Sequence, residues 1–314
     1  MTLTNSPVFA VCMLAAGLAA GMVWYALRLK KNSLPVRAAL IAAAAGSVLA
    51  LLLAKLGYLL HDLGANLTEG YFDEITELLP EKLSFVGGAL GITAGVALGA
   101  RLSGFRAKKA LDLFAAPGCV FLCLARLAEA GMETIGVGNE VEADWLKFFP
   151  LAIGDGWGGA SLSVFVLEAA WALVCLVPAL RTKQVRDGNV FIRTAVWLLG
   201  AQMGFETLLQ YPYIRSFMTS FVSLEQVLCA VLLLGIVVPR CIRGRKWLPL
   251  AAVLLLAGAS VFFQFYRDNK IEFLFEEGWE WALENAETIA SVAYLLIGAG
   301  MVWAGDRAVR ETGM

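Results

Sequence analysis

Residues 83–126 have the sequence LSFVGGALGITAGVALGARLSGFRAKKALDLFAAPGCVFLCLAR, and this stretch decides the fold. It contains two apolar runs joined by a short basic segment. The first run carries a glycine at every fourth position, namely Gly87, Gly91, Gly95 and Gly99. That spacing places the glycines on one helical face, where a neighbouring helix can approach closely. The second run contains Arg126, a cation within an apolar segment, so the stretch predicts a tightly packed helix and one buried positive charge.

The composition extends this picture to the whole chain. Of 314 residues, 59% are hydrophobic and only 16% are charged, and the mean hydropathy is +0.72. Apolar runs of about 20 residues recur, which is the length that crosses a bilayer core of roughly 30 Å. The short alternating segments of a transmembrane barrel are missing. The fold class predicted is therefore all-α, a polytopic helical membrane protein, and no nucleic-acid partner is expected.

Nine transmembrane segments are predicted. They are residues 8–28, 36–60, 83–100, 110–131, 161–180, 190–209, 223–239, 247–266 and 286–305. The connecting segments alternate in sign, and the basic ones are 28–31 with Arg37, 101–109, 181–186, 240–246 and 306–310. Because basic loops face the cytoplasm, all five fall on one side only if the N-terminus is outside and the C-terminus inside.

The six cysteines give no disulfide framework, because five lie within apolar segments and Cys241 lies at the end of one. Cys119 and Cys123 share a helix face, with no histidine or carboxylate nearby, and are interpreted as small core residues. Neither a metal nor a cofactor is therefore expected. The first apolar segment has no basic region before it, so no cleavable signal peptide is expected.

Three outer segments mix aromatic and charged residues: 71–82, 144–153 and 271–284. Two interpretations remain open for them. They are interfacial helices that lie in the headgroup layer, or they are aromatic belts that anchor the ends of the spans.

Ionisable residues within the spans are the main functional signal, since charge in a bilayer is costly and usually serves a function. They are Lys55, Asp112, Arg126, Glu129, Glu168, Arg193, Glu206 and Glu225. All except Asp112 and Arg193 fall in the predicted outer leaflet, which indicates a cavity open to that leaflet. The alternative is that the charges pair with each other and hold helices together. Asp112 and Arg193 are expected to snorkel or to cap helix ends near the cytoplasmic face.

Several motifs resemble those of the phosphatidylglycerol–prolipoprotein diacylglyceryl transferases. SFVGG (84–88) resembles the family's S-F-H-G-G, DLFAAP (112–117) its D-x-I-A-P, and Arg126 the arginine of its following G-R motif. AKLGY (54–58) is similar to G-R-I-G-Y. Glu206 with Tyr211 and Pro212 resembles the R-F-x-x-E-F-x-R-x-P stretch, and SLEQ (223–226) resembles S-M-G-Q.

The resemblance implies a domain of seven spans over residues 1–240, with residues 241–314 as two additional C-terminal transmembrane helices. It implies a location in the bacterial cytoplasmic membrane, with the site facing the outer leaflet. The family moves a diacylglyceryl group from phosphatidylglycerol to the lipobox cysteine of prolipoprotein signal peptides. The partners implied are thus phosphatidylglycerol or another anionic phospholipid, together with prolipoprotein signal peptides.

Site residues follow from the same resemblance. Arg126 and Lys55 would bind the lipid phosphate, since guanidinium and ammonium groups suit phosphate. The other predicted contacts with phospholipid are Gly87, Gly88, Gln202, Glu206 and Gln226.

The sequence departs from the family at five positions: Val86 replaces its histidine, Gln202 and Lys55 each replace an arginine, Glu129 replaces an asparagine, and Ala125 replaces the glycine before Arg126. A base must then come from His61, the only histidine, or from Glu129. Alternatively, His61 is an ordinary loop residue, and Glu129 neutralises Arg126 and weakens phosphate binding.

Two other functions remain open. A non-catalytic relative that binds phospholipid, or a transferase with a different acceptor, would explain Val86 and Gln202. A transporter is a third hypothesis, but the inner halves of the spans carry almost no charge that could line a path, and no internal repeat is present.

Overall fold

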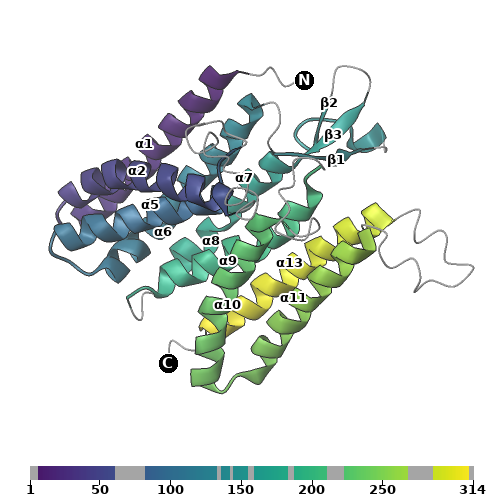
Figure 1. The fold of residues 1–314 in the computed structure, drawn as a ribbon. Coiled ribbons are helices and arrows are strands. Elements are labelled where there is room, and N and C mark those ends of the chain that lie inside the picture. The colour runs from purple at the N-terminus through teal and green to yellow at the C-terminus, as the bar shows by residue number, and fades with distance from the viewer. Residues whose placement is uncertain are drawn as a thin grey trace, which may run out of the picture. The chain divides into compact units, whose positions relative to one another are not determined.

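The computed structural model describes residues 6–60, 82–132, 136–141, 144–154, 159–182, 187–210, 223–267 and 286–310. The chain forms two compact units, Met1–Thr194 and Ala195–Met314 (Figure 1). The boundary falls within one helix, α9 (Asn189–Phe205). The predicted boundary at residue 240 marks where the family resemblance ends, and it stays a prediction.

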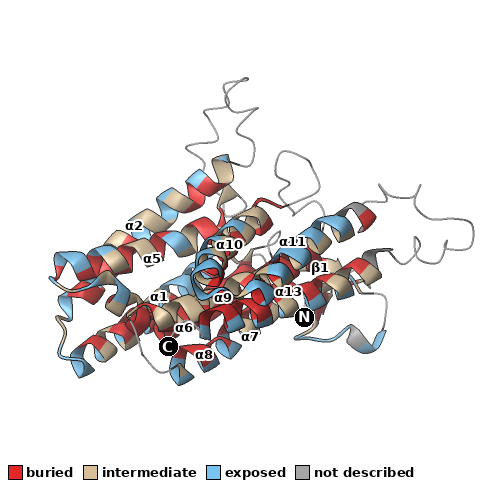
Figure 2. Cartoon of the chain, turned by 90° about the horizontal axis from the view of Figure 1, so that it is seen from below, coloured by how far each residue is buried: buried red, intermediate tan, exposed pale blue. Residues whose placement is uncertain are grey.

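The first unit is built on four long helices. They are α1 (Pro7–Lys31), α2 (Arg37–Leu59), α5 (Phe85–Leu102) and α6 (Ala107–Ala128). Two shorter helices follow, α7 (Val164–Val174) and α8 (Leu176–Arg181). Most residues of α6 are buried (Figure 2), so this helix forms the centre of the unit. Its Phe114 packs edge-on against Tyr25 of α1, with ring centroids 5.5 Å apart.

The glycine face of α5 packs directly against the backbone of α2, as the spacing predicted. A Cβ added at Gly91 would fall within 3.0 Å of backbone atoms of Ala50, and one at Gly95 would fall equally close to Gly46. Gly87 and Gly99 meet the α2 backbone in the same way. Because backbone atoms cannot move aside cheaply, the close approach of these two helices requires glycine at these positions.

Asp112 does not snorkel but caps a helix, the second of the two roles predicted for it. Its side chain, on α6, accepts hydrogen bonds from the backbone N–H groups of Gly188 (2.7 Å) and Phe191 (2.9 Å). These groups lie at the start of α9, where the first N–H groups of a helix have no partner within the helix. A carboxylate there also suits the positive end of the helix dipole. Asp112 thus joins α6 to the first turn of α9.

A small sheet lies between α6 and α7, in a segment where the sequence predicted none. Its strands are β1 (Val137–Glu140), β2 (Ala152–Gly154) and β3 (Ala160–Ser163), which are antiparallel in the order β1-β3-β2. The helical alternative for residues 144–153 was therefore wrong. Only the short 3₁₀ turn η3 (Asp144–Leu146) forms there, because Pro150 and the glycines that follow disfavour a helix.

The sheet also shortens the fifth predicted span. Residues 160–163 form β3, and the helix begins at Val164. In the loop of the sheet, Trp145, Phe148 and Phe149 are exposed. The belt alternative for this segment, in which such side chains lie at the membrane surface, stays a prediction. The other two outer segments, 271–284 and all of 71–82 except Lys82, lie outside the described residues.

The second unit consists of the end of α9, η4 (Glu206–Leu208), α10 (Leu224–Gly244), α11 (Trp247–Arg267) and α13 (Ala286–Arg310). Helices α11 and α13 pack along each other, and Tyr294 donates a hydrogen bond to the carbonyl of Ser260 (2.7 Å). A Cβ at Gly204 would lie 3.0 Å from the carbonyl oxygen of Tyr294. Close glycine contacts therefore join α9 to α13 within this unit.

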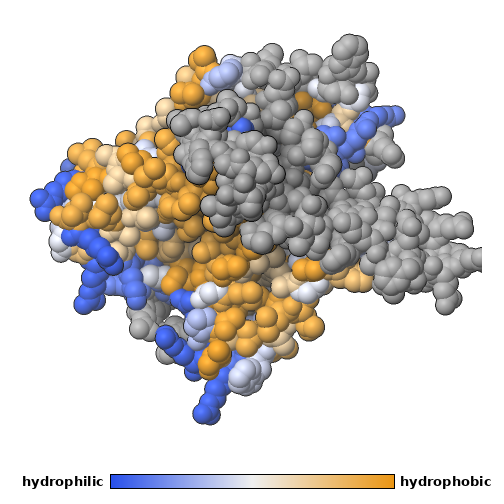
Figure 3. Space-filling model, viewed as in Figure 1, coloured by the Kyte–Doolittle hydropathy of each residue, from blue (hydrophilic) through white to orange (hydrophobic). Residues whose placement is uncertain are grey.

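The helices have the length and surface of membrane spans. A helix lies over each of the nine predicted segments, and seven helices of the described residues are long and apolar enough to cross a membrane. Large apolar side chains on α2, including Leu40, Val48 and Leu52, are exposed, and apolar residues cover much of the surface seen in Figure 3. The chain is therefore a multi-pass helical membrane protein. The count of nine and the orientation stay predictions.

Candidate functional site

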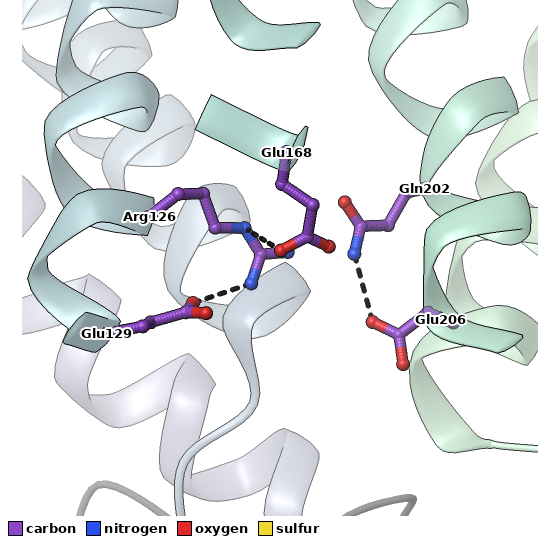
Figure 4. A network of polar contacts seen from close by, with 5 residues as sticks. All are labelled: Arg126, Glu129, Glu168, Gln202 and Glu206. Carbon is purple, nitrogen blue, oxygen red and sulfur yellow. Dashed lines mark hydrogen bonds and ion pairs between the residues drawn. The ribbon is translucent and has the colours of Figure 1, made fainter. Parts of the chain in front are cut away.

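The candidate site of the first unit is centred on Arg126, in the last turn of α6 (Figure 4). Its Nη1 lies 2.7 Å from Oε1 of Glu129, and its Nε lies 3.1 Å from Oε2 of Glu168. The guanidinium carbon stacks 3.4 Å from the ring centroid of Phe85. All three charged side chains are less than a tenth exposed. We call Arg126, Glu129 and Glu168 the Arg126 cluster.

Each residue that contacts Arg126 has a defined position in a helix. Glu129 follows three residues later and begins the short 3₁₀ helix η2 (Glu129–Gly131), so it lies on the same face. Glu168 comes from the second turn of α7. Phe85 is the first residue of α5 and lies just after the N-cap residue Ser84. The guanidinium group of Arg126 on α6 therefore contacts residues of three other elements, η2, α7 and α5.

The start of α5 is fixed by Ser84. Its hydroxyl accepts a hydrogen bond from the backbone N–H of Gly87 (3.0 Å), as in a normal N-cap. Its own N–H donates to the carbonyl of Ala54 on α2 (2.9 Å). A Cβ on Gly57 would fall within 3.0 Å of the Ser84 side chain. Segments 54–58 and 84–88, two of the motifs singled out in the sequence, are thus in direct contact.

Lys55 lies in the same turn of α2 as Ala54. It is buried, with 7% of its surface exposed, and its Nζ lies 4.9 Å from the ring centroid of Tyr58. The predicted second cation is thus a buried residue of the first unit.

Glu129 has a distinct environment. Gly136, before β1, has φ +75°, a conformation that favours glycine, and a Cβ there would collide with the side chain of Glu129 and with Phe165. Oε1 of Glu129 contacts Arg126, whereas Oε2 is buried and accepts no hydrogen bond within the described part of the chain. A buried carboxylate oxygen of this kind can accept a proton or a hydrogen bond from a ligand.

The charges of the Arg126 cluster do not balance. One guanidinium faces two carboxylates, so the formal net charge is −1 when all three are ionised. Charge buried in a low-dielectric region is costly unless it is compensated. Arg126 pairs with Glu129, as the alternative for Glu129 requires, and with Glu168, which the predicted site omitted. The effect of this pairing on phosphate binding stays a prediction.

Two other predicted residues, Gly87 and Gly88, behave differently. The space beside Gly87 is filled by the backbone of α2, so this glycine takes part in helix packing, and its contact with lipid stays a prediction. Gly88 has only the Cβ of Ala54, at 3.9 Å, near its own hypothetical Cβ. Val86, which stands where the family has its histidine, is buried. His61, Tyr211 and Pro212 lie outside the described residues.

The remaining predicted residues form a network of their own in the second unit. Gln202 donates from Nε2 to Oε1 of Glu206 (3.0 Å), and the hydroxyl of Ser223 donates to Oε2 of Glu206 (3.4 Å). Ser223 and Gln226 form a reciprocal capping box at the start of α10. Gln202, Glu206 and Gln226 are therefore brought together, around one buried carboxylate.

Comparisons with protein-family models, with curated proteins and with solved structures find no match for this chain. Within the part of the chain that the structure describes, no group of three or more histidine, cysteine or acidic side chains is placed to hold a metal ion. The features of this chain that bear on its function are therefore the residues of the two networks and the motifs that contain them.

Proposed function

We propose that this chain is a membrane transferase related to the prolipoprotein diacylglyceryl transferases, acting on a glycerophospholipid in the outer leaflet of a bacterial plasma membrane. One observation supports it most. Segments 54–58 and 84–88 and Arg126, which carry the resemblance, are far apart in the sequence yet meet through the Gly57–Ser84 and Phe85–Arg126 contacts. The orientation that goes with this proposal has the N-terminus outside, seven family-like spans and two additional ones.

The proposed reaction transfers a diacylglyceryl group to the thiol of a lipobox cysteine. The thiol gives its proton to a base and its sulfur forms a bond to the terminal glycerol carbon of the lipid. The bond from that carbon to the phosphate oxygen breaks, and the headgroup phosphate leaves with the electron pair. By resemblance the lipid is phosphatidylglycerol and the departing group is glycerol phosphate.

The proposed reaction needs a base for the thiol proton and cations for the departing phosphate, and buried residues of the first unit can fill both roles. Glu129 is the proposed base, because it is buried and its Oε2 accepts no hydrogen bond within the described residues. Arg126 and Lys55 stabilise the negative charge that develops on the departing phosphate. Glu168 and Phe85 hold the guanidinium in position. His61 remains the other candidate base.

Complementation tests this proposal. Bacteria depleted of their own diacylglyceryl transferase would express the chain, and lipidation of a reporter prolipoprotein would be followed by mass spectrometry. The expected result is diacylglyceryl attached to the lipobox cysteine, with activity lost in Glu129→Gln. Glu140→Gln is the matched control, since Glu140 is an exposed carboxylate of β1 outside the cluster. Properly inserted protein that lipidates no substrate would reject the lipoprotein version.

A second candidate is a relative that binds phospholipid without reacting with it. Two observations favour it: the buried Val86 cannot titrate, and both carboxylates of the Arg126 cluster already engage the guanidinium. Native mass spectrometry would then show phospholipid retained by the wild type, while the same lipid incubated with acceptor peptides gives no product. Any detectable transfer product excludes this second function.

A further inference from the structure

Three aromatic side chains in the loop between β1 and β2, those of Trp145, Phe148 and Phe149, are exposed. Within the described residues, every other large apolar side chain that is exposed lies on an α-helix or on a residue that caps one. The acyl chains of a bilayer cover such side chains on membrane helices, but they do not reach a loop beyond the helix ends. An exposed apolar cluster on a loop instead indicates a contact with a membrane surface or a protein.

The loop that carries these side chains has a defined backbone. The N–H groups of Leu151 and Ala152 both donate hydrogen bonds to the carbonyl of Phe148 (2.9 Å each). The N–H of Ser163, on β3, donates to the carbonyl of Leu151 (2.9 Å). Ala152, which follows the loop on β2, is buried. The loop is thus bonded to the sheet, and its aromatic rings are exposed although hydrogen bonds fix its backbone.

The sheet lies at the ends of two membrane helices, α6 and α7. Both belong to helical segments that are long and apolar enough to cross a membrane, Ala107–Gly131 and Val164–Arg181, and the sheet connects them (Figure 1). The N–H of Phe165, at the start of α7, donates to the carbonyl of Gly136 (3.0 Å), and Gly136 lies against the side chain of Glu129. The sheet and the Arg126 cluster are therefore on the same side of the membrane.

From the exposed rings and their position we infer that this loop inserts into the phospholipid headgroup layer on the side of the Arg126 cluster and anchors the sheet there. Aromatic side chains favour this layer, and the indole of Trp145 has an apolar ring with a polar N–H. The two charged residues of the loop, Asp144 and Lys147, form an ion pair (2.9 Å). The contact therefore depends on aromatic area, and an uncharged phosphatidylcholine surface suffices. The inference does not depend on the proposed transfer reaction.

Photocrosslinking in the full-length protein tests the inference. The photoreactive residue p-benzoylphenylalanine would replace Trp145 in protein reconstituted in phosphatidylcholine nanodiscs, and mass spectrometry would measure the lipid adduct. Glu140, exposed on β1, is the matched position on the same sheet, and Leu52, exposed on α2, is the positive control on a membrane helix. We expect about tenfold more lipid adduct at Trp145 than at Glu140, because burial of one aromatic side chain favours the inserted state at least that strongly. Adding phosphatidylglycerol should leave the yield unchanged.

Lipid adduct at Leu52 without lipid adduct at Trp145 overturns the inference. A crosslink from position 145 to a second copy of the chain also overturns it, because the aromatic surface then serves a protein contact.

A second measurement needs no photoreactive residue. The difference in fluorescence between the wild type and Trp145→Phe isolates the emission of Trp145. Lipids brominated near the headgroup should quench this difference more than lipids brominated near the ends of the acyl chains, since Trp prefers the interface. Quenching by aqueous iodide with none by either brominated lipid would instead show that the loop stays in water and overturn the inference.

Discussion

Two helix contacts of the first unit differ in the groups that form them. Helices α2 and α5 pack backbone against backbone at glycines, which have no side chain. Helices α6 and α7 share a small apolar cluster of Cys123, Ala169 and Ala172, but they are also joined by charge, in the ion pair between Arg126 and Glu168. The first contact gains from dispersion over a large area. The second depends on a few groups whose removal leaves others uncompensated.

The difference explains why only one of the two contacts suggests a function. A glycine face needs no ligand, because its partner is the neighbouring backbone. A cluster with one cation and two carboxylates is not balanced by its own charges, so it can respond to a proton or a charged ligand. Substitutions in the two contacts should therefore differ in how much stability they remove and in which further substitutions restore it.

Removing the cation should have the largest effect. Arg126→Met leaves Glu129 and Glu168 buried without their guanidinium, and we expect a loss of about 3–5 kcal/mol in the free energy of unfolding. Denaturant unfolding of the purified protein in detergent micelles would measure it.

The control for this variant removes the whole cluster. Arg126→Met combined with Glu129→Gln and Glu168→Gln leaves no buried charge there, and replacing an entire buried ion cluster is often close to neutral. Stability should therefore return to within about 1 kcal/mol of the wild type. If the single and triple variants are equally unstable, packing rather than charge holds α6 to α7.

The glycine contact should respond less strongly, and no charge substitution should restore it. Gly91→Ala places a Cβ against the backbone of Ala50, and overpacking of this kind costs about 1–3 kcal/mol. Gly88→Ala is a control on the same helix, because its nearest neighbour would be the Cβ of Ala54 at 3.9 Å. Thermal unfolding of both variants in detergent makes the comparison. Equal stability of the two would mean that the contact between α2 and α5 tolerates a Cβ at Gly91.

Asp112 is a buried carboxylate that accepts hydrogen bonds from backbone N–H groups. Asp112→Ala removes the acceptor for the N–H groups of Gly188 and Phe191, and we expect a loss of about 1–2 kcal/mol, as for a helix cap. Hydrogen exchange should become faster at these two amides. Unchanged exchange there would show that other groups hold the start of α9.

The fold followed from the sequence where the signal was local. Apolar runs of membrane length and the spacing of Gly91 and Gly95 predicted the helices and one glycine face for close packing, because both depend on periodicity along one segment, whereas the partner helix α2 was not predicted. The sheet was missed, since strands of three or four residues give little alternation and pair with partners far along the chain. Its presence moved the start of the helix from residue 161 to Val164.

The candidate site was predicted only in part. Arg126 stood out as a charge within an apolar run, and Glu129 followed from helical spacing. Which of the other carboxylates predicted for the outer leaflet pairs with Arg126 depends on how α6 and α7 are rotated against each other, and no local pattern specifies that rotation. Glu168 was therefore not among the predicted site residues. Gly136 has a detectable signal, a glycine before a strand, but its contact with Glu129 is a tertiary one.

Phe85 joins the two contacts and should give the smallest effect. It begins α5, the helix with the glycine face, and its ring stacks on the guanidinium of Arg126. Phe85→Leu keeps an apolar side chain but removes the cation–π contact, so we expect a loss of about 1 kcal/mol in the free energy of unfolding.

Measuring Phe85→Leu in both the wild type and the triple variant separates the cation–π contact from apolar packing. In the triple variant without the Arg126 cluster there is no cation to stack, so the substitution should cost less than in the wild type, and the difference is the coupling energy. An equal cost in both backgrounds would mean that Phe85 contributes only as an apolar surface. A smaller cost in the triple variant would mean that the guanidinium is held from α5 as well as from α7, so that the start of the glycine helix helps to orient the one cation of the cluster.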